Sequence, residues 1–308
     1  MIGLPISYSR GVSLRVIVQI ELFWKHHFAY MAPQKSSMSL SVGEREKKLM
    51  KLLGGLLGLA AAANTNTNKP NVLFIFSDDQ GFSDVSWKNS KVKTPNLDRL
   101  RQRGMTIDGA YSQARCSPSR VALLTGKYPW KIGVETGVFQ LLAKNGIRPK
   151  ETLFPELLQH HGYDTHMYGK WHLGYCDEAL HPTNRGFDTF HGFWGSGGIN
   201  YYSKVPSGSG GIYDYWVSEN GQSTERQSSA YSTDEFTNDA LKMLDERQAS
   251  GDTDPFFAYM AYNAPHSPFE VPDHSIIAEY DDIPDNNRKI LLSMIYRMDA
   301  MVGSLIQK

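Results

Sequence analysis

Residues 72–79 have the sequence Val-Leu-Phe-Ile-Phe-Ser-Asp-Asp. Five consecutive apolar residues that give way abruptly to polar ones predict a strand buried on both faces, as in a parallel sheet. Open α/β sheets bind their ligands beyond the carboxyl ends of such strands. Adjacent carboxylates repel each other unless a cation lies between them, and hard oxygen ligands suit calcium or magnesium. Asp78 and Asp79 are therefore candidate metal ligands, and the plainer alternative is a helix N-cap at Asp79.

Two further runs repeat this pattern of a strand followed at once by polar residues. Residues 163–168 alternate in polarity and lead into Gly-Lys-Trp-His-Leu-Gly, which places Lys170 and His172 just past a strand end. Residues 255–262 are almost entirely apolar and lead into a stiff loop in which His266 is flanked by prolines. Three strands of this kind predict an α/β fold whose ligands bind at their carboxyl ends. A solvated turn and a loop histidine bonded to backbone are the plainer alternatives.

Cys116 opens the stretch Cys-Ser-Pro-Ser-Arg, which ends at Arg120. Pro118 suits the first turn of a helix and Gly126 can end that helix, so Cys116 is expected at a helix N-terminus, where anions bind. An isolated cysteine is more often a buried, inert thiol. The chain has two cysteines, and with Cys176 alone as its possible partner no disulfide framework is expected.

These motifs and their order resemble those of the sulfatase family within the alkaline phosphatase superfamily. The Cys-x-Pro-x-Arg frame at residues 116–120 and Gly-Lys-Trp-His-Leu-Gly at 169–174 are specific to that family, and residues 94–98 and 185–188 add matches. The resemblance covers roughly residues 69–308 and is closest to the arylsulfatase B-like branch. It implies an α/β/α sandwich with a mixed, mostly parallel sheet, of which this chain would hold the N-terminal part.

The resemblance also implies how the nucleophile and the metal site are built. A formylglycine-generating enzyme is expected to oxidise Cys116 to an aldehyde, whose hydrate carries two hydroxyls on one carbon. Asp78, Asp79 and the converted Cys116 are expected to bind one calcium ion. A sulfate ester is a poor electrophile, so its hydrolysis needs an activated oxygen beside concentrated positive charge.

The remaining residues carried over by the resemblance are cations and acid–base groups. Arg120 and Lys170 are expected to balance the charge of the sulfate. His266 is expected to protonate the departing alcohol, and His172 to deprotonate the second hydroxyl, each worth ~10²–10⁴-fold in rate. The implied function is that of an arylsulfatase-type sulfuric ester hydrolase. Its substrate would be a sulfated small molecule or glycan, with sulfated amino sugars or glycosaminoglycans suggested by the branch.

Two other functions stay open. A phosphohydrolase of the same superfamily would use a serine or threonine nucleophile and usually two metals, which the Cys-x-Pro-x-Arg frame disfavours. An inactive fragment or binding protein is the other alternative, because in the family a strand ending in Asp-Asn and a further lysine follow a helix like that at residues 290–305. The chain is therefore expected to be C-terminally truncated, with an exposed apolar helix face, an unpaired sheet edge and little turnover.

The sequence upstream of residue 70 predicts targeting rather than fold. Residues 50–63 have a basic start, a short apolar centre and small residues at the end, as in a secretory signal peptide, and an internal apolar helix is the alternative. Residues 1–49 are expected to be an upstream extension outside the fold, residues 64–69 a polar linker and residues 70–308 the catalytic domain. These features predict the secretory pathway, with a lysosomal or extracellular destination.

Composition limits the possible partners. The formal net charge is zero and 41% of the residues are hydrophobic, which is typical of a soluble globular chain without the charge excess of a nucleic-acid-binding protein. We therefore expect no nucleic-acid partner and no stable membrane insertion. A sulfated polymer would have to be held by local charges.

Overall fold

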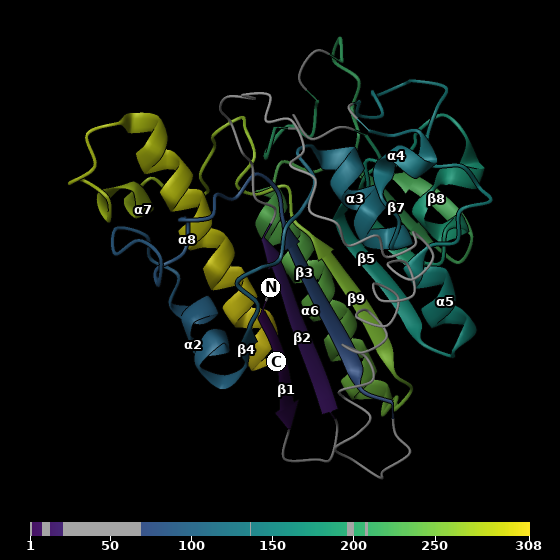
Figure 1. The fold of residues 1–308 in the computed structure, drawn as a ribbon, viewed down its shortest axis with the longest axis horizontal. Helices are drawn as coiled ribbons and strands as arrows, with labels where there is room; N and C mark the ends of the chain where they lie inside the picture. Colours follow the sequence, from purple (N-terminus) through teal and green to yellow (C-terminus); the bar gives the residue numbers. More distant parts are fainter. Residues whose placement is uncertain (1, 8–12, 21–68, 136, 196–199, 207–208) are drawn as a thin grey trace, which may run out of the picture.

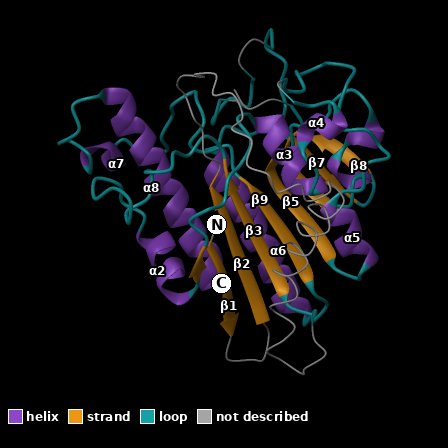
Figure 2. Cartoon of the chain, in the orientation of Figure 1, coloured by secondary structure: helices purple, strands orange, loops and turns teal. Residues whose placement is uncertain are grey.

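A nine-stranded mixed sheet forms the centre of the structure, a computed structural model that describes residues 2–7, 13–20, 69–135, 137–195, 200–206 and 209–308 (Figures 1 and 2). The strands are β1 (Ile2–Ser7), β2 (Ser13–Ile20), β3 (Asn71–Ser77), β4 (Met105–Thr106), β5 (Asp164–Lys170), β6 (Thr189–Phe193), β7 (Trp216–Glu219), β8 (Gln222–Glu225) and β9 (Phe256–Ala261). Their order across the sheet is β4-β1-β2-β3-β9-β5-β6-β7-β8. The pairs from β2 to β6 are parallel, and the pairs toward both edges are antiparallel.

Helices cover both faces of this sheet. They are α2 (Pro95–Arg103), α3 (Cys116–Thr125), α4 (Pro129–Ile132), α5 (Phe154–His160), α6 (Ser232–Ser250), α7 (Ser275–Ala278) and α8 (Asn286–Gln307), with 3₁₀ turns η1 (Glu178–Leu180) and η2 (Pro182–Asn184). Buried residues of α2, α6 and α8 share one hydrophobic core, and those of α3, α4 and α5 share another. Residues of β3 alternate between these cores, with Leu73 and Ile75 in the first and Phe74 and Phe76 in the second. The α/β/α sandwich with a mostly parallel sheet is confirmed.

The three strands predicted from the apolar runs lie side by side. β9, whose residues are all buried, lies between β3 and β5 and is parallel to both. The predicted helix is α3, which begins at Cys116 and ends at Thr125, and its C-cap Gly126 adopts the left-handed conformation with φ of 66°. Glycine reaches that conformation without steric cost, which is why the helix ends there.

The edge of β3 away from β9 is paired with β2, in parallel, and β2 is paired with β1. This placement differs from the expectation that residues 1–49 lie outside the fold, and it corrects that expectation for the segments 2–7 and 13–20. The run Val-Ile-Val-Gln-Ile at residues 16–20 is rich in β-branched residues, which suit a strand beside the apolar β3. Because β3 is paired on both sides, the expected unpaired edge is absent there. The signal-like segment 50–63 and residues 64–68 lie outside the described residues.

Helix α8 packs its apolar side into the protein. Met294, Met298 and Val302 are buried in the core that α8 shares with α2 and α6, so the expected exposed apolar face is wrong. By length and composition α8 is apolar enough to cross a membrane, but half of its apolar window is buried here, as in the core helix of a globular protein. Asp299 of α8 also accepts hydrogen bonds from the backbone N–H groups of Asn96 and Leu97 at 3.0 and 2.8 Å, which caps α2.

Candidate active site

A fully buried ion cluster lies where the parallel strands end. Asp78 directly follows β3, Lys170 ends β5, and Arg120 reaches them from α3. Asp78 Oδ2 accepts a hydrogen bond from Lys170 Nζ and lies 3.4 Å from Arg120 Nη2. Arg120 Nη1 also donates to the Lys170 carbonyl at 2.5 Å, and the Asp78 N–H donates to the Ala264 carbonyl at 3.0 Å. The contacts join α3 to the ends of β3, β5 and the loop after β9.

The charges of this cluster are set by its own members. Burial by itself would raise the pKa of Asp78, but Lys170 and Arg120 outweigh burial and hold that pKa well below its usual range. Burial would lower the pKa of Lys170, but the Asp78 carboxylate outweighs it and raises that pKa. All three side chains are therefore charged at neutral pH, and the cluster has a net charge of plus one.

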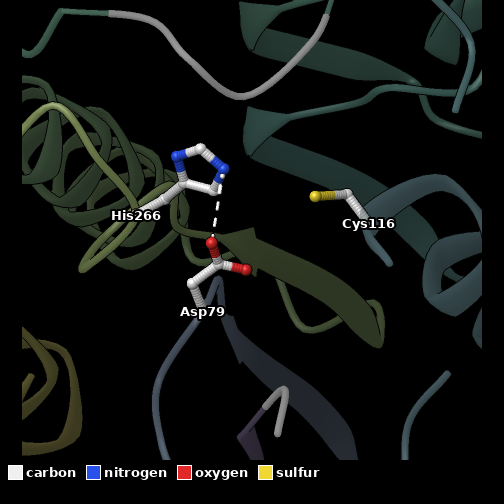
Figure 3. Close-up of side chains that lie close together, drawn as sticks. All are labelled: Asp79, Cys116 and His266. Atoms are coloured by element: carbon white, nitrogen blue, oxygen red, sulfur yellow. Dashed lines mark ion pairs between the residues drawn. The ribbon is translucent and has the colours of Figure 1, made fainter. Parts of the chain in front are cut away.

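A second cluster adjoins the first and contains Asp79, Cys116 and His266 (Figure 3). One ligating atom of each residue lies within 4.8 Å of those of the other two, and His266 Nε2 is 3.4 Å from Asp79 Oδ2. Asp79 has φ of 59°, a conformation that is uncommon for a residue other than glycine and is often found at functional sites. Cys116 is the first residue of α3, so its sulfur lies at the positive end of a helix dipole.

The hydrogen bonds of His266 leave its Nε2 lone pair facing a carboxylate oxygen of Asp79, and both of these atoms are acceptors. Its Nδ1 is 2.5 Å from the Ser267 carbonyl, which can only accept, so Nδ1 carries the proton in the neutral ring. Burial, and then Lys170, lower the pKa of His266, which favours that neutral ring. Its Nε2 lone pair then faces the Asp79 carboxylate. A proton or a metal ion between the two groups would relieve this repulsion.

The donor set suits a divalent cation. Asp78 Oδ1 is buried and has no hydrogen-bond partner among the described residues, so a hard oxygen ligand is available beside Asp79. The sulfur of Cys116 and the imidazole of His266 are ligands that zinc prefers. An oxygen in place of that sulfur would shift the preference toward calcium.

His172 follows β5 and is almost completely buried, with φ of 60°. Its Nε2 lies 3.0 Å from the Phe139 carbonyl and must donate there, which leaves a lone pair on Nδ1, an atom without a hydrogen-bond partner among the described residues. Burial first, and then Lys170 and Arg120, lower the pKa of His172 well below its ordinary value. The ring is therefore neutral and can accept a proton only at Nδ1.

Two residues that sequence analysis did not select hold these groups in place. Ser117 Oγ donates to the His172 carbonyl at 3.0 Å and accepts from the Phe139 N–H at 3.1 Å, which fixes the loop after β5 to the first turn of α3. The Tyr201 hydroxyl lies 3.0 and 2.8 Å from the carbonyls of Asn263 and His266. Ser117 lies within the motif that contains Cys116, whereas Tyr201 is distant in sequence from every site residue.

The structure thus brings all seven predicted site residues to one end of the sheet. Asp78, Arg120 and Lys170 form the ion cluster, Asp79, Cys116 and His266 form the ligating cluster, and His172 is fixed to α3 through Ser117. No disulfide joins Cys116 to the exposed Cys176.

Comparisons with known proteins agree with this arrangement. Residues 70–308 match the sulfatase family profile. The chain is 35% identical to mouse arylsulfatase J over 246 residues, covering 79% of this chain and 40% of that protein. It is 30% identical to an arylsulfatase of Klebsiella aerogenes over 237 residues, covering 75% of this chain and 50% of that protein. The chain therefore spans about half the length, or less, of these relatives.

Comparison with solved structures agrees with these sequence matches. The crystal structure of Ps i-CgsB superposes with a TM-score of 0.68 at 34% identity, covering 77% of this chain and 54% of that one. The same protein in complex with k-i-k-neocarrahexaose matches with a TM-score of 0.68 at 33% identity. From the match over residues 70–308 and these relatives, the chain belongs to the sulfatase family.

Proposed function

We propose that this chain carries the active site of a sulfuric ester hydrolase of the arylsulfatase type. The observation that carries the proposal is the position of Cys116 at the N-terminus of α3, within 4.8 Å of ligating atoms of Asp79 and His266. A cysteine beside a carboxylate and a histidine, at the positive end of a helix, is suited to nucleophilic chemistry on an anion.

The nucleophile is proposed to be formylglycine made from Cys116 by a formylglycine-generating enzyme. Its hydrate would supply two hydroxyls on one carbon, one for attack on sulfur and one for the release of sulfate. The protein's part is to fix this carbon. Ser119 Oγ donates to the Arg115 carbonyl at 2.7 Å, and the Ser119 N–H donates to the same carbonyl at 2.9 Å, so two hydrogen bonds close the turn that holds Cys116.

The sulfate is proposed to bind beside the ion cluster. A sulfate monoester carries one negative charge, and Asp78, Arg120 and Lys170 together carry one positive charge. Because these three side chains are buried and fixed by one another, they provide charge stabilisation without reorganisation during the reaction.

The histidines are proposed to move the protons. His266, which carries its Nδ1 proton against Ser267, can bind a further proton at Nε2 and pass it to the departing alcohol. His172 has its only lone pair on Nδ1 and can accept the proton of the second hydroxyl. Each transfer is worth ~10²–10⁴-fold in rate.

The metal is proposed to be one calcium ion, which Asp78, Asp79 and the converted Cys116 would hold. Calcium would polarise the sulfate oxygens and offset the charge of the two carboxylates. Before conversion, the sulfur of Cys116 with Asp79 and His266 makes a set that also fits zinc. The affinity for calcium relative to zinc should therefore depend on whether Cys116 has been oxidised.

The substrate is proposed to be a sulfated small molecule or a sulfated glycan. Support comes from the arylsulfatase relatives and from the neighbour crystallised with k-i-k-neocarrahexaose. The secretory pathway, with a lysosomal or extracellular destination, is part of the same proposal. A phosphohydrolase and a non-catalytic binding protein remain the alternatives against which the proposal is tested.

The test combines peptide mass spectrometry with turnover. The chain is expressed in a host that converts other sulfatases, and the peptide containing Cys116 should carry formylglycine. The purified protein should hydrolyse 4-nitrocatechol sulfate faster than the matching phosphate ester. Cys116→Ser should abolish turnover, whereas Cys176→Ser, at the exposed cysteine, should leave it unchanged. Unmodified Cys116, or turnover that survives Cys116→Ser, would contradict the proposal.

A further inference from the structure

Two large aromatic side chains lie together on the surface near α4. Tyr128 and Trp130 are 53% and 57% exposed, and their ring centroids are 6.4 Å apart with planes 22° from parallel. Most of the large aromatic residues in the described structure are buried in the two cores. A pair of adjacent, nearly parallel and exposed rings offers an apolar platform to a ligand.

Cations lie next to this platform. Lys131 Nζ lies 5.7 Å from the centroid of the Trp130 ring, and Arg148 Nη2 donates to the Lys131 carbonyl at 3.4 Å. Lys127 Nζ and Arg148 Nη2 both contact Glu151, at 2.8 and 3.0 Å. We define Lys127, Tyr128, Trp130, Lys131 and Arg148 as the aromatic-basic patch.

The aromatic-basic patch is rich in cations. Two of them, Lys127 and Arg148, share one carboxylate, Glu151, whose side chain is only 8% exposed, whereas the side chains of Lys127 and Arg148 are about half exposed. The positive charge therefore lies outward and the negative charge inward. The chain as a whole has no net charge, so this gathering of cations is local.

Helix α3 connects the patch to the candidate active site. The helix begins at Cys116 and ends at Thr125, and Lys127 follows two residues later (Figure 1). Ten helical residues rise roughly 15 Å, so the patch and the proposed nucleophile lie at opposite ends of one short rigid element. One glycan chain of a few sugar units can reach both.

We propose that the aromatic-basic patch binds a sulfated polysaccharide and holds it while one of its sulfate groups occupies the active site. Sugar rings present apolar C–H faces that pack on aromatic rings, and their sulfate groups pair with lysine and arginine. An anionic polymer with apolar ring faces matches both halves of the patch. The claim that this polymer is also the substrate rests on the proposed function. The claim that the patch binds the polymer does not depend on it.

The test measures polymer binding and small-substrate turnover separately. Calorimetric titration with dextran sulfate, with unsulfated dextran as the matched polymer, gives the dissociation constant at low and moderate salt. Trp130→Ala, and Lys131→Gln with Arg148→Gln, should each weaken binding of dextran sulfate about fivefold to tenfold. Lys242→Gln, which removes an exposed charge from α6 on the opposite face of the sheet, should change it less than twofold. The charge variant should also show a shallower salt dependence.

The outcomes separate this inference from the proposed function. All variants should keep the parent's thermal unfolding and its kcat/KM for 4-nitrocatechol sulfate, which is too small to reach the patch. Unchanged affinity of Trp130→Ala and of the charge variant for dextran sulfate would overturn the inference. Equal affinity for double-stranded DNA, or tighter binding to vesicles containing phosphatidylserine, would overturn it too. Absence of small-substrate turnover in the parent would instead refute the proposed function.

Discussion

Lys170 and Asp78 form an ion pair in which neither side chain is exposed to solvent. The two residues lie at the ends of β5 and β3, with β9 between these strands, so the pair connects the flanks of the central strand. Because water is excluded, removing Asp78 would leave two buried cations, Lys170 and Arg120, without a counter-ion. The same pair therefore supports both the fold and the charge of the candidate active site.

Replacing Asp78 should be far more damaging than replacing Lys170. Asp78→Asn should lower the free energy of unfolding by about 3–5 kcal/mol, because it leaves Lys170 and Arg120 buried together without a carboxylate. Lys170→Met should cost clearly less stability, because Asp78 and Arg120 remain as a buried pair of opposite charge, but it should abolish turnover. Urea unfolding measures the stability. Lys242→Met, at an exposed pair with Glu246, should change it by less than about 1 kcal/mol. Asp78→Asn as stable as the parent would contradict the prediction.

Calcium should stabilise the folded chain through Asp79. A ligand that binds only the folded state adds about 2.7 kcal/mol at a concentration one hundred times its dissociation constant, so the melting temperature should rise with calcium. Asp79→Asn should abolish this rise, whereas Asp281→Asn, at an exposed carboxylate, should preserve it. Zinc should stabilise the unconverted chain, and Cys116→Ala should remove that effect alone. Calcium stabilisation that survives Asp79→Asn would rule out the proposed ligand.

The burial of His166 should make stability fall in mild acid. Burial, and then Arg247, lower the pKa of His166 to about 4, so the folded state favours the neutral ring. Its stabilising contribution is complete above an unfolded pKa of about 6.5 and is lost as the pH falls toward 4, by up to about 3 kcal/mol. His166→Gln should remove this slope from urea unfolding measured between pH 7 and 4. His160→Gln, at an exposed histidine, should retain it; identical slopes for both variants would refute the assignment.

Close approach of neighbouring strands should make Gly192 intolerant of a side chain. A Cβ at Gly192 would lie 1.9 Å from the backbone oxygen of Gly169, its partner across β5 and β6. Because neither backbone can move without breaking the ladder, Gly192→Ala should cost at least about 3 kcal/mol of stability or prevent folding. Gly137→Ala meets no atom within 4 Å and should be nearly neutral. Thermal unfolding compares the two, and equal stability would contradict the argument.

Local patterns were sufficient to predict the elements that carry the site. The strands predicted at β3, β5 and β9 and the helix that begins at Cys116 are confirmed, because each depends on neighbouring residues alone. The position of β9 between β3 and β5 was not predicted, since it depends on pairing between distant segments. The same limitation explains why β2 was missed as a partner of β3.

The contacts within the site could not be predicted from the sequence as well as the strands and the helix could. The motifs indicated which residues lie at strand ends, but they gave no sign of the left-handed backbone of Asp79 or of the acceptor-to-acceptor contact between Asp79 and His266. The hydroxyl of Tyr201 bonds the loop of His266 from a distant segment, and such a contact leaves no local pattern. The functional roles of these residues remain predictions.

The long separation between paired strands also affects how the protein is made. Phe256 of β9 donates its N–H to Asn71 of β3 across a separation of 185 residues. At 5–20 residues per second, the ribosome needs roughly 10–40 s to synthesise that interval. For that time the apolar run of β3 lacks its central neighbour, and Asp78 lacks Lys170 for part of it. A nascent chain with such a β-prone segment exposed is prone to aggregate, so chaperones that shield it during translation should determine the yield.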